Sequence, residues 1–353
     1  MHFSEISINS LRCIERLNLS LSPGLNLIEG RNGSGKTTFL EALSFVSLGR
    51  SLNPTQTRDV IREGCSLVRV GATLDLGVGR RLKVQVTKSK IGTKITLNER
   101  LIKSSSDLAQ KVPLVAINSE VAGILTSAPH ARRVLLDRVM FHVERDYISL
   151  WREYRQALNQ RNGVLRQSKD RRQAQFWTER LAFLGAKIDV YRKEIVSSLN
   201  NHLETSFLDV GMGSFSLLYE SGWEGGSLFD QLEGGWLRDL ELGYTRVGIH
   251  RSDVRLRVGS KNRPRRLSRG QLKVIASEIM LGLAGFMQQK TGIYPIMLVD
   301  DIQSELDDIM RATLVDRLLG FGGQKFFTAI GSGSHPEIFK KADMVFHVEH
   351  KNL

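Results

Sequence analysis

Residues 30–37 are Gly30-Arg31-Asn32-Gly33-Ser34-Gly35-Lys36-Thr37, and they match the pattern G-x-x-x-x-G-K-[ST]. The apolar run at 25–28 predicts a strand before them, and the run at 39–48 predicts a helix after them. Glycines let backbone N–H groups point into an anion-sized hollow at a helix N-terminus. The order of strand, loop and helix therefore predicts a phosphate-binding loop rather than a simple glycine turn.

The loop predicts ATP and Mg²⁺ as cofactors. Lys36 would supply positive charge to the β and γ phosphates, and the Thr37 hydroxyl would be a ligand of Mg²⁺. The residues expected to bind ATP here are Gly30, Arg31, Asn32, Gly33, Ser34, Gly35, Lys36, Thr37 and Thr38.

A second segment ends in two carboxylates. Residues 296–299 are apolar and fit a central parallel strand, and Asp300 and Asp301 follow at its carboxyl end, where ligands of such sheets gather. Asp300 is expected to hold Mg²⁺ together with Thr37, and Asp301 to orient the attacking water. A strand with a polar turn is the simpler interpretation, but the upstream loop favours catalysis by Lys36, Asp300 and Asp301.

Composition places the chain among ordinary globular proteins with a basic bias. The 353 residues suggest about two domains, and 41% are hydrophobic and 25% charged. Fifty Lys and Arg against 37 Asp and Glu give a net charge of +13. This bias suits a protein that meets a polyanion, either nucleic acid or an acidic membrane surface.

The sequence predicts a cytoplasmic protein without a membrane partner. Its two cysteines, Cys13 and Cys65, are too few for a disulfide framework and favour a reducing compartment. The first eight residues carry Glu5 and lack the pattern of a signal peptide. The longest apolar stretch, 279–287, is shorter than a membrane span requires and predicts a buried helix.

The chain alternates between sheet-like and helical segments. Strand and turn signals fill the first 100 residues, and helical spacing over 131–203 predicts a hairpin that turns near 168–172. Strand segments return at 215–219 and 245–258, and a helix is expected over 270–288. We therefore predict an α/β head formed by residues 1–125 and 204–353, with a helical lobe, 126–203, inserted into it.

Two further segments resemble motifs of the ATP-binding-cassette family. Leu267-Ser268-Arg269-Gly270-Gln271 precedes the acidic strand and is similar to the family signature, and Ser304-Glu305-Leu306-Asp307 follows the strand as the D-loop does. The resemblance implies that Ser268, Gly270 and Gln271 close on ATP held by a second subunit. It thereby implies an ATP-dependent homodimer with anion binding at a helix end.

Within that superfamily the whole chain resembles the RecF family, which is related to the heads of SMC proteins. The resemblance is carried by 10–12, the phosphate loop with 40–42, 49–51, 128–137, 160–162, 248–253, 268–271 and 300–307. It implies an ABC/SMC-type P-loop ATPase head with an inserted helical lobe, in which Arg12 touches the nucleotide. Three positions depart from the family pattern: Asn53, Ile249 and Leu272.

The resemblance also implies a function. The protein would be a recombination mediator and weak DNA-stimulated ATPase that clamps double-stranded DNA and junctions near single-strand gaps. It would support RecA loading indirectly, together with RecR and RecO. ATP would close the dimer, and hydrolysis would release it.

A basic run precedes the signature. Residues 251–269 hold eight Lys and Arg against one acid, Asp253, which suits binding to the phosphate backbone. A solvated basic hairpin is the alternative. The expected DNA-binding residues are Arg251, Arg263, Arg265 and Arg266.

Other ATPase classes share part of this pattern. The ATPase subunit of a membrane transporter has the same three motifs, but about 230 residues separate Lys36 from the signature here, more than such cassettes need. An SMC-type bridging protein needs a long coiled coil, and the helices predicted over 131–203 are too short. A small-molecule kinase would explain Lys36 but not the signature.

Overall fold

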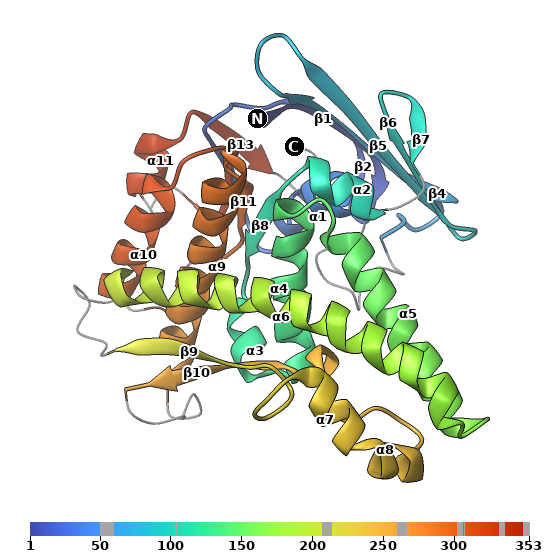
Figure 1. Cartoon of the computed structure of the whole chain (residues 1–353). Helices are drawn as coiled ribbons and strands as arrows, with labels where there is room; N and C mark the ends of the chain where they lie inside the picture. The colour runs from blue at the N-terminus through green and yellow to red at the C-terminus, as the bar shows by residue number, and fades with distance from the viewer. Residues whose placement is uncertain are drawn as a thin grey trace. The chain divides into compact units, whose positions relative to one another are not determined.

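The computed structural model describes residues 1–49, 60–102, 105–206, 214–259, 267–301, 306, 308–331 and 336–348, the side chains of 105–107 excepted. It divides into two compact units (Figure 1). The head unit comprises Met1–Ala122 and Arg269–Leu353, and the inserted unit comprises Gly123–Ser268.

The head unit contains two sheets. The parallel sheet has the order β13 (Met344–Val348), β3 (Leu25–Gly30), β12 (Lys325–Ala329), β11 (Ile296–Val299) and β8 (Leu114–Ile117). The antiparallel sheet has the order β2 (Ile14–Ser20), β1 (His2–Leu11), β4 (Leu67–Asp75), β5 (Arg81–Ser89), β6 (Thr93–Leu97) and β7 (Arg100–Ile102). The sheet-rich character expected for the first 100 residues is confirmed.

Helix α1 (Lys36–Leu48) lies between the two sheets and forms the centre of the core. It contacts β1, β4 and β5 on one side and β3 and β12 on the other, and α2 (Ser105–Lys111) packs beside it. Phe39 and Phe45 of α1 are fully buried, and the Phe39 ring lies 6.2 Å from that of Phe326 in β12. Gly49 ends the helix with φ of +67°, a conformation that glycine adopts without strain.

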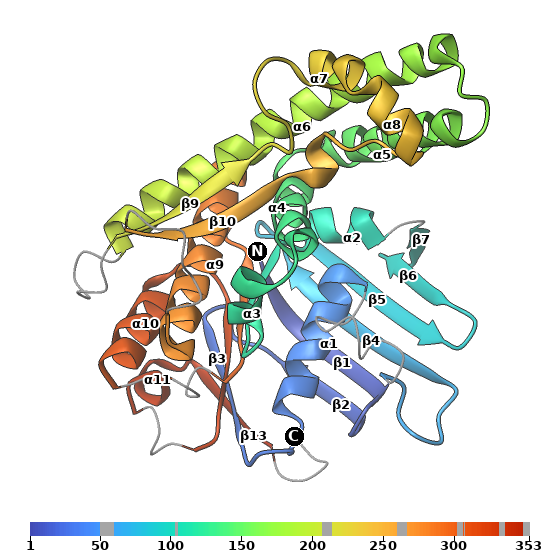
Figure 2. The same cartoon turned by 90° about the horizontal axis from the view of Figure 1, so that it is seen from below.

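Three helices complete the head unit: α9 (Arg269–Thr291), α10 (Asp308–Gly320) and α11 (Pro336–Lys341). They lie across the parallel sheet from α1 (Figure 2). Among the described residues, α9 alone is long and apolar enough to cross a membrane, but 83% of its most apolar window is buried within the fold. The buried helix expected around 279–287 is therefore confirmed, and its apolar side chains are core residues.

Strand β3 lies between β13 and β12 and is paired with both. Its first four residues are buried, and Asn26 among them has no exposed surface. Asn26 Nδ2 donates to the carbonyl oxygen of Ser22 at 2.8 Å, and its Oδ1 accepts from the Ser22 N–H at 2.8 Å. A buried polar group that is paired in this way costs little, so the turn before β3 and the strand are fixed together.

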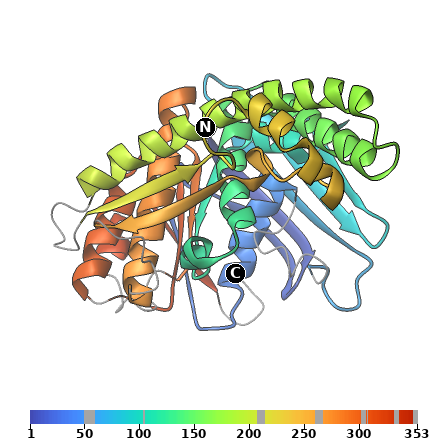
Figure 3. The same cartoon turned by 60° about the horizontal axis from the view of Figure 1, so that its bottom comes forward.

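The inserted unit combines helices with a two-stranded sheet (Figure 3). Its elements are α3 (Val121–Thr126), α4 (Pro129–Val143), α5 (Tyr147–Arg166), α6 (Arg171–Ser206), β9 (Phe215–Glu220), α7 (Leu228–Gly234), α8 (Trp236–Leu242), the 3₁₀ turn η2 (Ile249–Arg251) and β10 (Asp253–Val258). Helices α5 and α6 form the expected hairpin, with the turn at 167–170. The strand expected over 245–258 begins only at Asp253.

Two buried arginines connect helices α5 and α6 to elements beyond the predicted boundary at 203/204. Arg161 of α5 donates to Asp239 Oδ2 at 2.8 Å and to Thr245 Oγ1 at 2.7 Å. Arg192 of α6 donates to Asp137 Oδ1 at 2.8 Å and to the carbonyl oxygen of Ile249 at 2.8 Å. Both guanidinium groups are almost fully buried, so their partners on later elements belong to the same core.

His250 predicts a pH dependence of stability. Its Nδ1 lies 2.8 Å from Tyr154 Oη and its Nε2 3.1 Å from the carbonyl oxygen of Thr245, an arrangement that suits the neutral ring: Nε2–H donates and Nδ1 accepts. Burial lowers the pKa of His250 to about 4. Below the ordinary value of about 6.5, the unfolded chain therefore binds a proton that the folded chain does not.

The contribution of His250 to the free energy of unfolding is therefore fully present above about pH 6.5. It decreases by about 1.4 kcal/mol per pH unit as the pH falls towards 4. Urea titrations at pH 7, 6 and 5 should show this slope in the wild-type chain and a flatter one in His250→Gln. The exposed His130, substituted in the same way, serves as the control and should keep the wild-type slope. Equal slopes in the wild-type chain and His250→Gln would contradict the assignment.

Candidate nucleotide-binding site

The phosphate loop has the backbone that its glycines predict. Gly33 has φ of +77°, and Gly35, with φ of +119°, caps the N-terminus of α1. A side chain at Gly30 would have its Cβ 2.6 Å from the carbonyl oxygen of Val348, so this position has no room for one. The Ser34 hydroxyl is buried and has no hydrogen-bond partner among the described residues. The loop thus presents a tightly curled backbone at a helix N-terminus.

Lys36 lies inside this curl. Its Nζ donates to the carbonyl oxygens of Gly30, at 2.7 Å, and Arg31, at 2.9 Å. Burial lowers the pKa of Lys36, while the negative charges of Asp300 and Asp301 act in the opposite direction. The ammonium is therefore held at the loop by two carbonyls and faces two carboxylates.

The acidic strand end meets the loop as the sequence analysis expects. Thr37 Oγ1 donates to Asp300 Oδ2 at 2.9 Å, although 263 residues separate them. Thr328, at the end of β12, donates its hydroxyl proton to Asp300 Oδ1 at 2.7 Å and accepts from the Asp301 N–H at 3.1 Å. One hydroxyl therefore links the two neighbouring carboxylate residues.

These groups line one pocket of about 360 Å³. This volume is within the range of small-ligand sites. Of the loop residues expected at the phosphates, Gly30, Arg31 and Ser34 do not contribute to its lining. The residues that line it are Cys13, Asn32, Gly33, Gly35, Lys36, Thr37, Thr38, Asp300, Asp301, Thr328, Ala329 and Ile330.

The donor set near Thr37 and Asp300 suits Mg²⁺. A hydroxyl and a carboxylate oxygen are hard ligands, and Mg²⁺ in nucleotide sites is held by few protein groups together with water and phosphate oxygens. The residues present therefore fit a metal bound jointly with a phosphate chain.

Arg12 is placed beside the pocket rather than in its lining. It lies in the turn between β1 and β2 with φ of +47°, and its guanidinium binds the carboxylate of Glu41 through two nitrogens, with Nη2 3.0 Å from Oε1. Glu41 is buried in α1. The structure thus holds Arg12 beside the pocket by the carboxylate of Glu41, a role that the sequence did not predict.

None of the described residues of the signature and the basic run is among those that line the pocket. Ser268 is exposed, Gly270 is buried in the first turn of α9, and Gln271 follows it. Arg251 is exposed in η2, where its guanidinium lies 5.5 Å from the centre of the Tyr244 ring. Arg263, Arg265 and Arg266, the D-loop residues Ser304, Glu305 and Asp307, and Asn53 lie outside the described residues.

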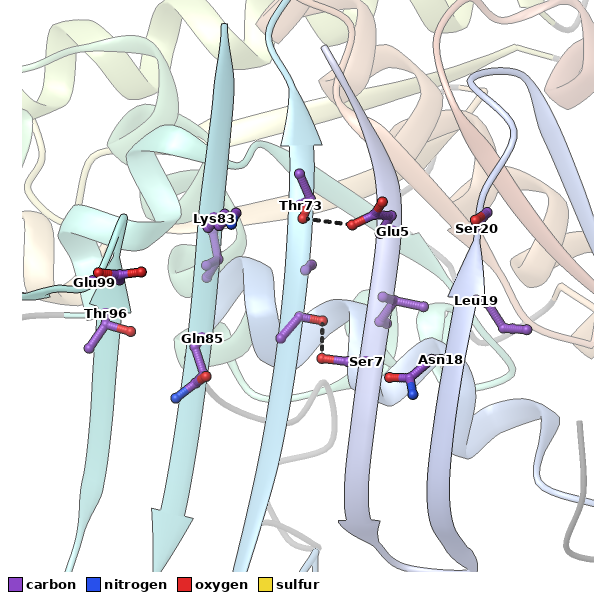
Figure 4. A pocket seen from close by; sticks show the side chains of 14 residues that line it. Glu5, Ser7, Asn18, Leu19, Ser20, Thr73, Lys83, Gln85, Thr96 and Glu99 are labelled. Atoms are coloured by element: carbon purple, nitrogen blue, oxygen red, sulfur yellow. Dashed lines mark hydrogen bonds between the residues drawn. The ribbon is translucent and has the colours of Figure 1, made fainter.

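A second, larger hollow lies on the outer face of the antiparallel sheet. It measures about 490 Å³, and the residues that line it come from β1, β2, β4, β5 and β6 and the turn after β6 (Figure 4). Thr73 donates to Glu5 there at 3.2 Å, and Ser7 to the carbonyl oxygen of Gly71 at 3.4 Å. Among its lining residues, neither a phosphate loop nor two carboxylates adjacent in sequence occur. Chemistry rather than size therefore identifies the first pocket as the functional one.

Fold and site together define the class: the chain is a P-loop ATPase head of the SMC type. A sequence model described as "RecF/RecN/SMC N terminal domain" matches residues 2–352. The DNA replication and repair protein RecF of Shewanella woodyi is 34% identical over 353 residues, which cover 99% of this chain and 96% of that protein. RecF of Vibrio cholerae is 32% identical over 359 residues, with 99% and 98% covered. The chain belongs to the RecF family.

Solved structures show the same fold. One described as the structure of the recombination mediator protein RecF-ATP in the RecFOR pathway has a TM-score of 0.85 at 24% identity and covers 99% of this chain and 96% of that one. An SMC head bound to the C-winged helix domain of ScpA has a TM-score of 0.58 at 14% identity, with 98% and 94% covered. The resemblance to the RecF family and the expected α/β fold class are thereby confirmed.

Proposed function

We propose that this chain is an ATP-dependent DNA-binding recombination mediator that acts in DNA repair and replication. The observation that carries the proposal is the junction of the phosphate loop with the acidic strand, where the Thr37 hydroxyl bonds to Asp300 at 2.9 Å. Family membership supports it, since RecF relatives are described as DNA replication and repair proteins.

The loop and four of the pocket side chains would have distinct tasks in binding and hydrolysing ATP. The loop N–H groups and Lys36 would hold the phosphates, and Thr37 and Asp300 would hold Mg²⁺, which supplies charge neutralisation when bound. Asp301, at the carboxyl end of β11, would orient the attacking water and accept its proton. Ser268, Gly270 and Gln271 would complete the site from a second copy of the chain.

The ATPase would act as a switch on DNA. ATP-driven dimerisation would clamp double-stranded DNA or its junction with a single-strand gap, and hydrolysis would reopen the dimer. The description of the solved RecF-ATP structure as part of the RecFOR pathway supports RecO and RecR as partners, with RecA served indirectly. We place this activity in the cytoplasm.

The proposal predicts DNA-stimulated hydrolysis that depends on Lys36. The rate of steady-state ATP hydrolysis should rise when duplex or gapped DNA is added to the wild-type chain. Lys36→Arg should lose this stimulation, because the larger guanidinium group cannot take the position of the Lys36 ammonium within the loop. The two proteins are compared in the same salt. Hydrolysis indifferent to DNA, without ATP-dependent DNA binding, would instead favour an ATPase that acts on a protein partner.

The basic run predicts the salt dependence of DNA binding. For duplex DNA, each arginine that no longer neutralises a phosphate should reduce the slope of log K against log salt by about 0.9. Replacing Arg263, Arg265 and Arg266 together by Gln should therefore flatten the slope by up to about 3. An unchanged slope in this triple variant would refute the role of the run in binding DNA. The matched control replaces three partly or largely exposed arginines outside the run: Arg171, Arg180 and Arg238.

A further inference from the structure

Lys273 is a buried cation that the proposed chemistry does not use. It lies in α9, only 1% of its surface is exposed, and it is absent from the lining of the nucleotide pocket. A buried ammonium is costly unless acceptors surround it. Its Nζ donates to the carbonyl oxygen of Asp301 at 2.7 Å. Lys273 therefore contacts the backbone of the residue proposed to orient the attacking water.

The backbone of Asp301 has an unusual conformation at this contact. Its φ of +48° is in the left-handed region, which residues with a side chain rarely adopt. Its carbonyl oxygen accepts from Lys273, and its N–H donates to Thr328 Oγ1 at 3.1 Å. The peptide groups on both sides of this strained Cα are thus held by side chains from two other elements, α9 and β12.

The conformation of Asp301 determines where its carboxylate points. Asp301 lines the pocket with Lys36 and Thr37, and it follows directly after Asp300, whose Oδ1 accepts from Thr328. A relaxation of φ towards the ordinary negative range would redirect the side chain while leaving Asp300 bound to Thr37 and Thr328. Strain that surrounding contacts maintain is a feature of positioning at active sites.

We propose that Lys273 is a positioning residue for hydrolysis: it fixes the Asp301 backbone so that the carboxylate faces the pocket. Because Lys273 lies within the first two turns of α9, the helix that begins at the signature, movement of this helix would be transmitted to the water-orienting carboxylate. The inference deepens the proposed ATPase function and rests on it.

Kinetics separate this role from nucleotide binding. Lys273→Met should lower kcat by about tenfold or more and leave the dissociation constant of a fluorescent ATP analogue within about threefold. Lys273→Arg, which keeps a charged donor, should recover part of kcat. Lys290→Met changes an exposed lysine at the other end of the same helix and should behave as the wild-type chain. Equal loss of binding and of kcat would overturn the proposal.

A combined variant tests whether Lys273 acts through Asp301. Asp301→Asn with Lys273→Met should hydrolyse ATP within about twofold of Asp301→Asn alone, because residues that act as a unit are not additive. Losses that multiply would show that the lysine acts elsewhere in the fold, and the proposal would fail.

Hydrogen exchange provides a readout that needs no hydrolysis. In the nucleotide-free chain, the Asp301 N–H should exchange faster in Lys273→Met than in the wild-type chain or Lys290→Met. Unchanged exchange would overturn the inference even if kcat falls. A wild-type chain that hydrolyses no ATP would contradict the proposed function instead, and the exchange measurement would still decide whether Lys273 fixes this backbone.

Discussion

Asp300→Asn is expected to lower kcat/KM for ATP hydrolysis by about 10²–10³-fold, a loss of about 3–4 kcal/mol of transition-state stabilisation. The substitution keeps the shape of the side chain but removes the negative charge. In the wild-type chain, one carboxylate oxygen of Asp300 accepts from Thr37 and the other accepts from Thr328. In the variant, the amide nitrogen replaces one of these oxygens and cannot accept from the hydroxyl group that it faces. Both the metal ligand and the order of the strand end should suffer.

Magnesium titration identifies the cause of that loss. The variant should require a higher Mg²⁺ concentration for half-maximal ATP binding, because one of the expected protein ligands has become neutral. Asp308→Asn is the control: this carboxylate is exposed in the first turn of α10 and pairs with Arg311. If Asp300→Asn retained wild-type kcat/KM and the same Mg²⁺ dependence, Asp300 could not hold the metal.

Asp137→Ala should destabilise the inserted unit by about 3–5 kcal/mol. The carboxylate lies within the core, where it accepts from Arg192 through two nitrogens and from the hydroxyl of Tyr147 at 2.6 Å. Burial alone would lower the pKa of Arg192, yet the charge and hydrogen bond of Asp137, together with the charges of Tyr147 and Tyr219, outweigh this and raise it. Removing the carboxylate leaves a buried guanidinium with neutral acceptors only, which is the costly way to break such a pair.

Urea unfolding, followed by tryptophan fluorescence, measures this effect. The matched control is Arg180→Gln, which breaks the pair with Glu153, where both side chains are nearly half exposed. Exposed pairs of this kind contribute about 0–1 kcal/mol, so the control should unfold close to the wild-type chain. Similar midpoints for Asp137→Ala and the control would mean that the Arg192 network does not stabilise the unit.

Local sequence patterns predicted the phosphate loop and the acidic strand. In both, the informative residues are neighbours in sequence, and the strand before them has three or four apolar residues in four positions. The bond between Thr37 and Asp300 could be anticipated because parallel strands of one sheet end at the same edge. The fold class and the long helical hairpin followed from the same periodicities.

Contacts that depend on tertiary packing were not predictable in this way. Thr328 is one polar residue near the end of a buried strand, and only the order of β11 and β12 in the sheet brings it to Asp300. Lys273 and Glu41 look like helix-surface residues until packing buries them. Contacts across the predicted boundary at 203/204 were not predictable either, because Arg161 and Arg192, which bind elements beyond it, resemble solvated charges in a basic helix.

The order of strands in the parallel sheet has a consequence for how the chain acquires its structure. Strand β3, which leads into the phosphate loop, pairs with β12 and β13, as in Leu25 with Lys325 and Asn26 with Met344. About 300 residues separate these partners, so at ~5–20 residues per second the ribosome needs roughly 15–60 s between them. During that interval an apolar strand lacks both neighbours, and the emerging chain depends on chaperones or on its own antiparallel sheet to keep that strand from aggregating.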